Sequence, residues 1–338
     1  MRLCACFLLV VLLSGCHTGS YSGPISDHFN GKKFHYPGEE RKKVHSSYYL
    51  LSLLIEVLNH PWPKKVPEIH YSNYPNYPKD AKITFVNHST VLIQTNSVNF
   101  LIDPVYSYRA SPFQWIGPYR VRAPGIKFVD LPKIDVVLIS HNHYDHMDLP
   151  TIKRLHEVFH PLFVVPLGNK KYLQYYGIEN VIELDWWQHI FCKQAKITFL
   201  PAKHDTQRWL HDHNRTLWGS FGIEVENKKI YFAGDSAYAI HFKDIRKRWG
   251  RPDFSFIPIG AYEPRNLEKC CHADPIQAVQ AHLDLESKAS MGIHWGTFQL
   301  ASEGVDTPAI DLDRARKKYN VPERNFFVIQ EGLPIYLP

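Results

Sequence analysis

The feature that most constrains this chain is a run of four metal-binding residue types within six positions: His141, His143, Asp145 and His146. The run directly follows Asp135–Ser140 (DVVLIS), a continuous apolar stretch that is typical of a strand buried on both faces. Any one of the 20 histidines alone would be read as an ordinary core or surface residue. Four ligands at this spacing cannot all reach one ion with good tetrahedral angles, but a loop can direct them toward two. Imidazole and carboxylate together suit zinc, iron or manganese better than calcium or magnesium.

From about residue 80 onward, β-rich runs alternate with helical patterns. Strands are predicted at Lys82–Val86, Thr90–Thr95, Val98–Ile102, Asp135–Ser140, Leu162–Val165, Val181–Leu184, Ala195–Leu200, Ser220–Val225, Lys229–Ala233, Phe254–Ile259 and Ala289–Ile293. Helices are predicted at Leu149–Phe159, Phe242–Trp249 and Asp274–Leu285, the last with a proline in its first turn. This order predicts an α/β fold in which two sheets form a sandwich with helices outside.

The first residues predict export. Leu3–Leu13 is an apolar run that is too short to span a bilayer, so it reads as the core of a signal peptide. It ends in Leu13-Ser14-Gly15-Cys16, which resembles the lipobox of bacterial lipoproteins, where the cysteine is lipidated. The alternatives are a secretory signal with a chance cysteine, or a small buried helix. Lipidation of Cys16 is the favoured reading, and acyl chains would anchor the protein stably to a membrane surface.

Three segments are therefore expected: a signal peptide at 1–15, a tether and lead-in at 16–78, and a catalytic domain at 79–338. The lead-in contains a predicted helix, His45–His60, whose apolar face is expected to pack onto the domain rather than to contact lipid. Residues 61–80 are rich in proline, which forbids long regular structure. Because His17 follows Cys16, where aspartate commonly retains lipoproteins at the inner membrane, the outer membrane is the favoured destination.

The composition excludes few other classes of protein. The chain is 44% hydrophobic and 21% charged, as in ordinary globular proteins, and its formal net charge of +6 fits a solvated basic surface. No basic stripe with interleaved aromatic residues is present, so nucleic acid is not an expected partner. The six cysteines show no disulfide framework, because three precede residue 17 and two are adjacent.

The H-x-H-x-D-H run resembles the metal-binding motif of the metallo-β-lactamase superfamily. That resemblance implies an αββα sandwich, two divalent ions and further ligands at the ends of later strands. The chain offers His204 after ITFLPAK, Asp235 after IYFAG and His294 after SMGI. By the same resemblance, one ion would bind His141, His143 and His204, the other would bind Asp145, His146 and His294, and Asp235 would bridge them. Zinc is the metal that the resemblance implies, although iron or manganese would also fit these ligands.

Several longer stretches narrow the resemblance. They are Asn142–His146, Glu179–Trp187, Leu217–Ser220, Phe232–Ser236, Ile257–Arg265, His272–Pro275 and Ile293–Phe298. Together they resemble the N-acylphosphatidylethanolamine-hydrolysing phospholipase D family and its bacterial relatives over roughly residues 80–320. One departure is Asn87-His88, where the family usually has Gly-His.

The resemblance implies a phosphodiesterase that releases an N-acylethanolamine and leaves phosphatidic acid, with a metal-activated water as the nucleophile. Asp145 and Asp235 would be its catalytic carboxylates, although a ligand role accounts fully for Asp145. Tyr144 and His272 would contact the substrate phosphate. Their alternatives are a packing aromatic beside the metal loop and a cap for the helix that starts at Asp274.

Two other functions remain open at this stage. The same metal site could serve a lactonase or a hydrolase of soluble phosphodiesters. A non-catalytic, metal-binding envelope lipoprotein is the alternative from another class, and the presence of every expected ligand speaks against it. The expected partners are a membrane phospholipid and, through Cys16, the membrane surface; the oligomeric state and the acyl preference are left open.

Overall fold

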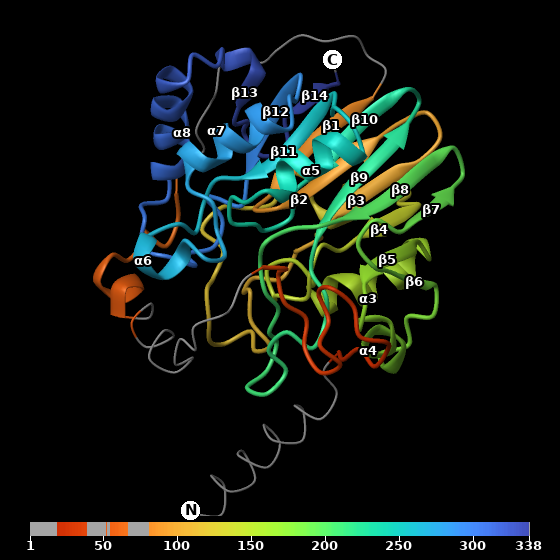
Figure 1. The fold of residues 1–338 in the computed structure, drawn as a ribbon. Helices are drawn as coiled ribbons and strands as arrows, with labels where there is room; N and C mark the ends of the chain where they lie inside the picture. The colour runs from red at the N-terminus through yellow and green to blue at the C-terminus, as the bar shows by residue number, and fades with distance from the viewer. Residues whose placement is uncertain (1–18, 39–51, 53–54, 67–80, 338) are drawn as a thin grey trace, which may run out of the picture.

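Two seven-stranded mixed sheets pack face to face, and helices cover the outer face of each sheet (Figure 1). This architecture comes from a computed structural model, which describes residues 19–38, 52, 55–66 and 81–337. The αββα sandwich predicted from the sequence is confirmed. Signal-peptide residues 1–15, the lipobox cysteine Cys16 and the predicted domain start at 79 lie outside the described residues.

The first sheet is antiparallel at one end and parallel at the other. Its strands, in spatial order, are β14 (Pro334–Tyr336), β1 (Lys82–Asn87), β2 (Thr90–Gln94), β3 (Asn99–Ile102), β4 (Val136–Leu138), β5 (Leu162–Pro166) and β6 (Val181–Leu184). The strands from β3 to β6 run parallel, in the register Ile102↔Leu138 and Leu138↔Val164. Parallel strands end at one edge of a sheet, so the loop after β4 is placed at that edge.

The second sheet repeats this arrangement. Its spatial order is β13 (Phe326–Phe327), β12 (Ala289–Ile293), β11 (Phe254–Pro258), β10 (Lys228–Phe232), β9 (Ser220–Val225), β8 (Ala195–Leu200) and β7 (His189–Cys192). Strands β10 to β13 are parallel, in the register Phe232↔Phe256 and Pro258↔Ile293. The loops after β10 and β12 therefore emerge at the same edge of this sheet.

Three apolar clusters correspond to the three interfaces between layers. The largest lies between the sheets and contains Phe85, Phe199 and Phe221. The second packs helices α3 (Leu149–Phe159) and α4 (Lys170–Tyr175) onto the first sheet. The third packs α5 (His241–Arg248), α7 (Pro275–Asp284) and α8 (Thr307–Lys318) onto the second sheet. A short helix, α6 (Arg265–Glu268), precedes α7.

Helix α7 shows how local sequence sets an element's bounds. Asp274 accepts a hydrogen bond from the backbone N–H of Gln277, and the Gln277 side chain accepts one from the backbone N–H of Asp274. This capping box satisfies N–H groups that the first turn would leave unpaired, and Pro275 occupies the first turn, as predicted. The cap is Asp274, so the alternative that His272 caps this helix is wrong.

Residues 19–38 were expected to belong to a tether, but they lie against the sandwich. Phe29 and Phe34 are each 1% exposed and belong to the cluster between the sheets. The backbone N–H of Phe34 donates to the carbonyl oxygen of Asn214. Two aromatic anchors within a polar stretch thus fix this segment to the domain. Of the predicted helix His45–His60, residues 52 and 55–59 are described and helical.

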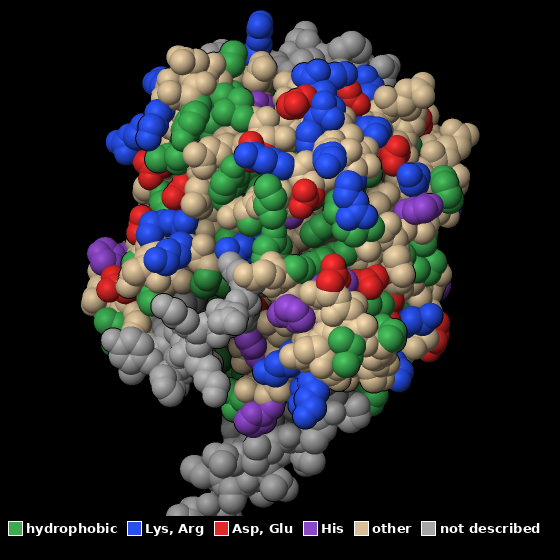
Figure 2. All heavy atoms as spheres, in the orientation of Figure 1, with side chains coloured by type: hydrophobic (Ala, Val, Ile, Leu, Met, Phe, Trp, Pro, Cys, Tyr) green, Lys and Arg blue, Asp and Glu red, His purple; other side chains and the backbone are tan. Residues whose placement is uncertain are grey.

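In the described part of the chain, no helix is long and apolar enough to cross a membrane. On the face shown in Figure 2, Lys and Arg side chains lie interspersed with Asp and Glu side chains. Ion pairs between exposed or half-buried side chains, such as Arg246 with Glu286 and Lys196 with Glu224, also occur among the described residues. The pattern on this face agrees with the expectation of a solvated basic surface.

The packing of residues 19–38 leads to a stability prediction. Phe34→Ala should lower the free energy of unfolding by about 3–5 kcal/mol, because it removes a buried ring and leaves a cavity. Ile25→Ala, in the same segment at a side chain that is 75% exposed, should change it by less than about 0.5 kcal/mol. Urea denaturation of both variants checks this. Equal effects would show that the segment is not part of the folded unit.

His28 supplies a pH-dependent contact to the same segment. Its Nε2 lies 2.8 Å from Asp185 Oδ1, and its Nδ1 lies 2.6 Å from Asp27 Oδ1. Burial opposes the charged imidazole, but the two carboxylates raise the pKa of His28 above its ordinary 6.5. A raised pKa stabilises the fold below 6.5, and that stabilisation is lost as pH rises through the folded value.

We therefore expect the free energy of unfolding of the wild type to fall as pH rises from 6.5 through this raised pKa. His28→Gln should remove that component, since glutamine does not titrate. The measurement is the difference in denaturation free energy between the two proteins across this pH range. A difference that is independent of pH would contradict the ion-pairing role of His28.

Candidate metal centre

Strand ends from both sheets bring the predicted ligands together. The loop with His141, His143, Asp145 and His146 follows β4 of the first sheet. The other three ligands follow strands of the second sheet: His204 after β8, Asp235 after β10 and His294 after β12. The seven predicted ligands all fall within sets of side chains whose potential ligand atoms lie within 4.8 Å of one another.

One set contains three histidines. The Nδ1 atom of His143 lies 2.9 Å from Nε2 of His141 and 3.2 Å from Nε2 of His204. His141 and His204 are buried, whereas His143 is half-buried. This is the set that the family resemblance assigned to the first ion.

A second set gathers around the Asp145 carboxylate. Its Oδ2 atom lies 3.3 Å from Nε2 of both His146 and His294. These residues were assigned to the second ion. The structure adds a fourth member, because Nε2 of His88 lies 2.9 Å from the same oxygen.

Asp235 lies between the two sets. Its Oδ2 atom is 3.1 Å from Nε2 of His146 and 3.0 Å from Nε2 of His294, on the side of the second set. It is also 3.7 Å from Nε2 of His204 and 3.8 Å from Nε2 of His141, on the side of the first. A carboxylate in this position fits the bridging role that the resemblance implies.

The unsatisfied polar atoms of the centre support a fit to metal ions. Among the described residues, His146 Nε2 and Asp235 Oδ1 are buried and have no hydrogen-bond partner. Buried polar atoms without partners are costly, and ligand atoms of a metal site are one known reason for them. Neutral imidazole and carboxylate are the donor types that zinc, iron and manganese accept.

The pKa values of the histidines also differ between the two sets of ligands. Burial and neighbouring histidines lower the pKa of His143 to about 4 and hold that of His141 well below its ordinary value. Both imidazoles are therefore neutral near pH 7, the form that binds metal. Burial also opposes charge on His294, but Asp235 and Asp145 raise its pKa to about 9. The two carboxylates thus make the second position strongly attractive to a cation.

Neighbouring groups orient the ligands through their second nitrogen atoms. Asp103 Oδ2 lies 2.7 Å from Nδ1 of His146, and the Ser140 hydroxyl donates to the same oxygen. The carbonyl oxygen of Cys271 lies 3.0 Å from Nδ1 of His204. Such partners fix the tautomer and the ring orientation of metal-binding histidines.

The two predicted phosphate contacts have different surroundings. His272 lies beside the centre: its ring centroid is 5.0 Å from that of His204 and 5.2 Å from that of His294. The Tyr144 hydroxyl instead donates to the carbonyl oxygen of Arg208, and the Arg208 guanidinium lies 3.9 Å from the centroid of the Tyr144 ring. The geometry of Tyr144 therefore agrees with its alternative role as a packing aromatic.

Sequence reasoning missed Asp103, His88 and Asp205 as members of this neighbourhood. Asp103 and His88 come directly after β3 and β1, so a polar residue at a strand end was the available signal. Asp205 follows a predicted ligand, and its Oδ1 lies 3.6 Å from Nε2 of His143. A lone polar residue after a strand is too common to have been selected without the fold.

Comparisons with known proteins agree with this geometry. A family model described as "Beta-lactamase superfamily domain" matches residues 98–295, which is more than half of the chain. The N-acyl-phosphatidylethanolamine-hydrolyzing phospholipase D 1 of Caenorhabditis elegans is 40% identical over 230 residues, 65% of this chain and 65% of that protein. The mitochondrial enzyme of that name from Saccharomyces cerevisiae is 34% identical over 237 residues, 68% of this chain and 50% of that protein. The chain thus spans one half to about two thirds of the length of these relatives.

Among solved structures, isothiocyanate hydrolase from Delia radicum gut bacteria superposes with a TM-score of 0.62 at 17% sequence identity. The match covers 76% of this chain and 99% of that protein, and at this identity it supports the fold alone. The family match, the sandwich and the cluster of histidine and aspartate side chains lead to one conclusion. The chain belongs to the metallo-β-lactamase superfamily, and its histidine and aspartate side chains are placed so that they could hold metal ions.

Proposed function

We propose that this chain is a phosphodiesterase of phospholipase D type that hydrolyses N-acylphosphatidylethanolamine-like lipids to phosphatidic acid and N-acylethanolamine. The observation that carries the proposal is the position of Asp235 Oδ2 between two sets of metal-binding side chains. Similarity to two relatives named as N-acylphosphatidylethanolamine-hydrolysing phospholipases D supports the choice of substrate class.

The proposed cofactors are two divalent metal ions, with zinc as the metal implied by the family resemblance. His141, His143 and His204 would hold one ion, Asp145, His146 and His294 would hold the other, and Asp235 would contact both. When bound, the ions would act as Lewis acids that activate a water molecule and neutralise charge on the phosphoryl oxygens.

The protein's own groups would bind and orient the lipid phosphate. Among the described residues, the Nδ1 atom of His272 is buried without a hydrogen-bond partner. It could donate a hydrogen bond to a phosphate oxygen beside the centre, which is the role proposed for His272. The surrounding histidines hold the pKa of Asp145 and Asp235 well below the usual range despite burial. Both therefore act as charged ligands rather than as proton donors.

Tyr144 would act indirectly in this scheme. Its ring packs on Arg208, whose guanidinium donates to the carbonyl oxygens of Asn142 and Met147 at the two sides of the metal loop. A contact between Tyr144 and phosphate would require its hydroxyl to leave the carbonyl of Arg208. We therefore propose that Tyr144 shapes the loop that carries the ligands.

The proposal includes a membrane anchor. Lipidation at Cys16 would place an exported protein at a membrane surface, where a phospholipid is reached directly from the plane of the membrane. The envelope of a bacterial cell, with the outer membrane favoured, is the proposed location. This part of the proposal rests on residues 1–17 of the sequence alone.

The decisive experiment gives the full chain vesicles that contain N-acylphosphatidylethanolamine. We expect mass spectrometry to detect phosphatidic acid and N-acylethanolamine in equal amounts. Activity should be lost after dialysis against a chelator and recovered with zinc, because the proposed reaction requires metal ions bound to these ligands. Elemental analysis of the same sample should find two ions per chain.

Other outcomes would contradict the proposal in different ways. Turnover of soluble phosphodiesters or lactones, with none on vesicles, would keep the metal centre and overturn the lipid substrate. Two bound ions with no turnover of any of these substrates would favour a metal-binding protein without catalysis.

A single substitution tests the bridging carboxylate. Asp235→Ala should lower kcat/KM on the lipid by about 100-fold or more, since it removes a ligand from both proposed metal positions. Asp313→Ala is the matched control, because it removes a carboxylate that pairs with Arg316 and Lys317 on the surface of α8. Hydrolysis at the wild-type rate in Asp235→Ala would overturn the assignment of the centre.

A further inference from the structure

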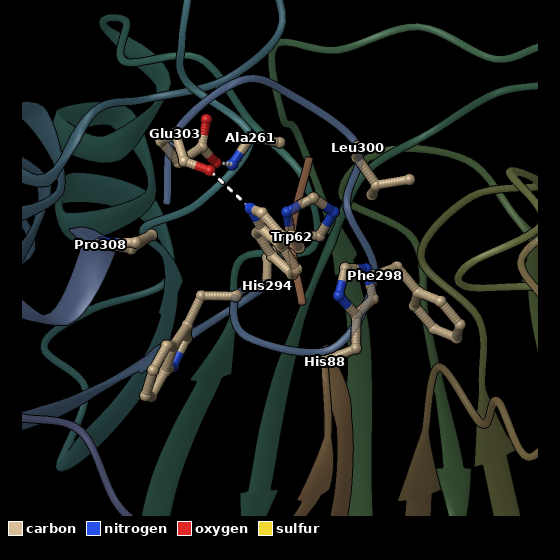
Figure 3. Close-up of a pocket in the computed structure, with 9 residues that line it drawn as sticks. Trp62, His88, Ala261, His294, Phe298, Leu300, Glu303 and Pro308 are labelled. Atoms are coloured by element: carbon tan, nitrogen blue, oxygen red, sulfur yellow. Dashed lines mark hydrogen bonds between the residues drawn. The ribbon is translucent and has the colours of Figure 1, made fainter. Parts of the chain in front are cut away.

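His88 is a buried histidine at the metal centre that the metal assignment does not use. It follows β1 directly and is 1% exposed. Its side chain lines a small pocket together with His294, Trp62 and Phe298 (Figure 3). His294 lines this pocket and is also a member of the second set of ligands. The pocket therefore lies on that side of the centre.

The two nitrogen atoms of His88 have different surroundings. Its Nε2 lies 2.9 Å from Oδ2 of Asp145, within hydrogen-bond distance. Its Nδ1 is buried and, among the described residues, has no hydrogen-bond partner. The Phe298 ring packs edge-to-face with the His88 ring, with a centroid distance of 5.3 Å and an interplanar angle of 78°. A proton on Nε2 lets His88 donate to the Asp145 carboxylate, whereas a proton on Nδ1 would remove this donor and bury an N–H group without a partner among the described residues.

The backbone holds His88 in place through two hydrogen bonds to the loop of His294. The N–H of His88 donates to Oγ1 of Thr297, and the N–H of His294 donates to the carbonyl oxygen of His88. Both histidines have left-handed backbones, with φ of 46° and 61°. Residues other than glycine rarely adopt this conformation, and it persists where surrounding contacts enforce it. The fold therefore maintains an unfavourable backbone that sets both rings on Asp145.

Asp145 needs such an orienting contact. Three imidazoles, those of His88, His146 and His294, approach its single oxygen atom Oδ2. His146 already has Asp103 on its other nitrogen and Asp235 beside Nε2, as expected of a metal ligand. Among the described residues, the Nδ1 atom of His88 has no such partner, and the one hydrogen bond of its side chain is with the Asp145 carboxylate. Its geometry is therefore that of a hydrogen-bond donor to a ligand.

We propose that His88 is a positioning residue, which donates a hydrogen bond from Nε2 to Oδ2 of Asp145 and holds this carboxylate toward the second metal position. This inference rests on the metal centre of the proposed function and is independent of the substrate. A carboxylate held in this way keeps its orientation before the ion arrives. The ion then binds without first having to order its ligand.

Two amide substitutions distinguish the roles of the two nitrogen atoms of His88. In His88→Gln the side-chain N–H₂ group can reach the place of Nε2, so the hydrogen bond to Asp145 is kept. In His88→Asn the side chain is too short to reach, while asparagine tolerates the left-handed backbone. His282→Asn is the control for loss of a buried histidine, because His282 lies on α7, pairs with Ser290 of β12 and is not part of the centre.

The readout is zinc binding to the full chain after removal of metal, measured by competition with a coloured chelator. We expect His88→Asn to bind one of two ions about 10–100-fold more weakly, and His88→Gln and His282→Asn to stay within about threefold of the wild type. X-ray absorption of the loaded proteins should count the same number of imidazole ligands in the wild type and in His88→Gln.

Two results would overturn the proposal. Wild-type affinity for both ions in His88→Asn would show that the contact with Asp145 orients nothing. Loss of one imidazole ligand in His88→Gln would show that His88 is itself a ligand, and this count decides the matter even if His88→Asn does not fold. Because zinc is the probe, absence of lipid hydrolysis would overturn the substrate proposal and leave this result unaffected.

Discussion

The burial of two carboxylates among imidazoles is the constraint on which the rest of the site depends. Asp145 and Asp235 are 8% and 3% exposed, and a buried charge without a partner costs several kcal/mol. Each carboxylate is compensated by histidines, most of which come from distant parts of the sequence. Asp235 contacts His146 and His294, and Asp145 contacts those two and His88. The cluster is therefore stable only when the strands that carry these residues are fixed relative to one another.

The αββα sandwich provides that fixation. The apolar cluster between the sheets joins β4, which leads into the metal loop, to β8, β10 and β12, which lead into the other ligands. Close-packed interiors deform little, so the distances between strand ends are set by packing rather than by the polar side chains. Metal binding can then use an arrangement that the apolar core has already placed, with Asp103 and Ser140 fixing the ring of His146 from behind.

The sequence predicted the parts of the fold that have a strong pattern. Strand β4 was found because a continuous apolar run marks a strand that is buried on both faces, and β8 and β11 were found as β-rich runs between turn residues. Strands β7, β13 and β14 were missed because they are short strands at sheet edges, and β7 alternates between exposed and half-buried residues. Helices α4, α6 and α8 were also missed; in α8, few side chains are buried in an otherwise charged sequence.

The candidate site divides in a similar way. The seven predicted ligands lie together in the structure. They could be found from the sequence, because the motif and the order of the ligands along the chain can be read without the fold. His88 and Asp103 could not be selected, because their roles depend on left-handed turns with φ of 46° and 43° that bring separate strands together. The direction of the Tyr144 hydroxyl could not be predicted from the sequence either. It depends on Arg208, a residue 64 positions away in the sequence.

Trp62, which precedes the predicted start of the catalytic domain, lies beside the second ligand set. The Trp62 indole stands beside His294 and His88, and its Nε1–H donates to the carbonyl oxygen of Glu303 (Figure 3). The Glu303 carboxylate in turn accepts hydrogen bonds from the backbone N–H groups of Ala261 and Glu263. The Trp62 indole thus lines the small pocket beside His88 and His294, on the side of the second ligand set. Together with Phe29 and Phe34 in the core, this contact shows that described residues before position 79 pack against the sandwich and beside the second ligand set.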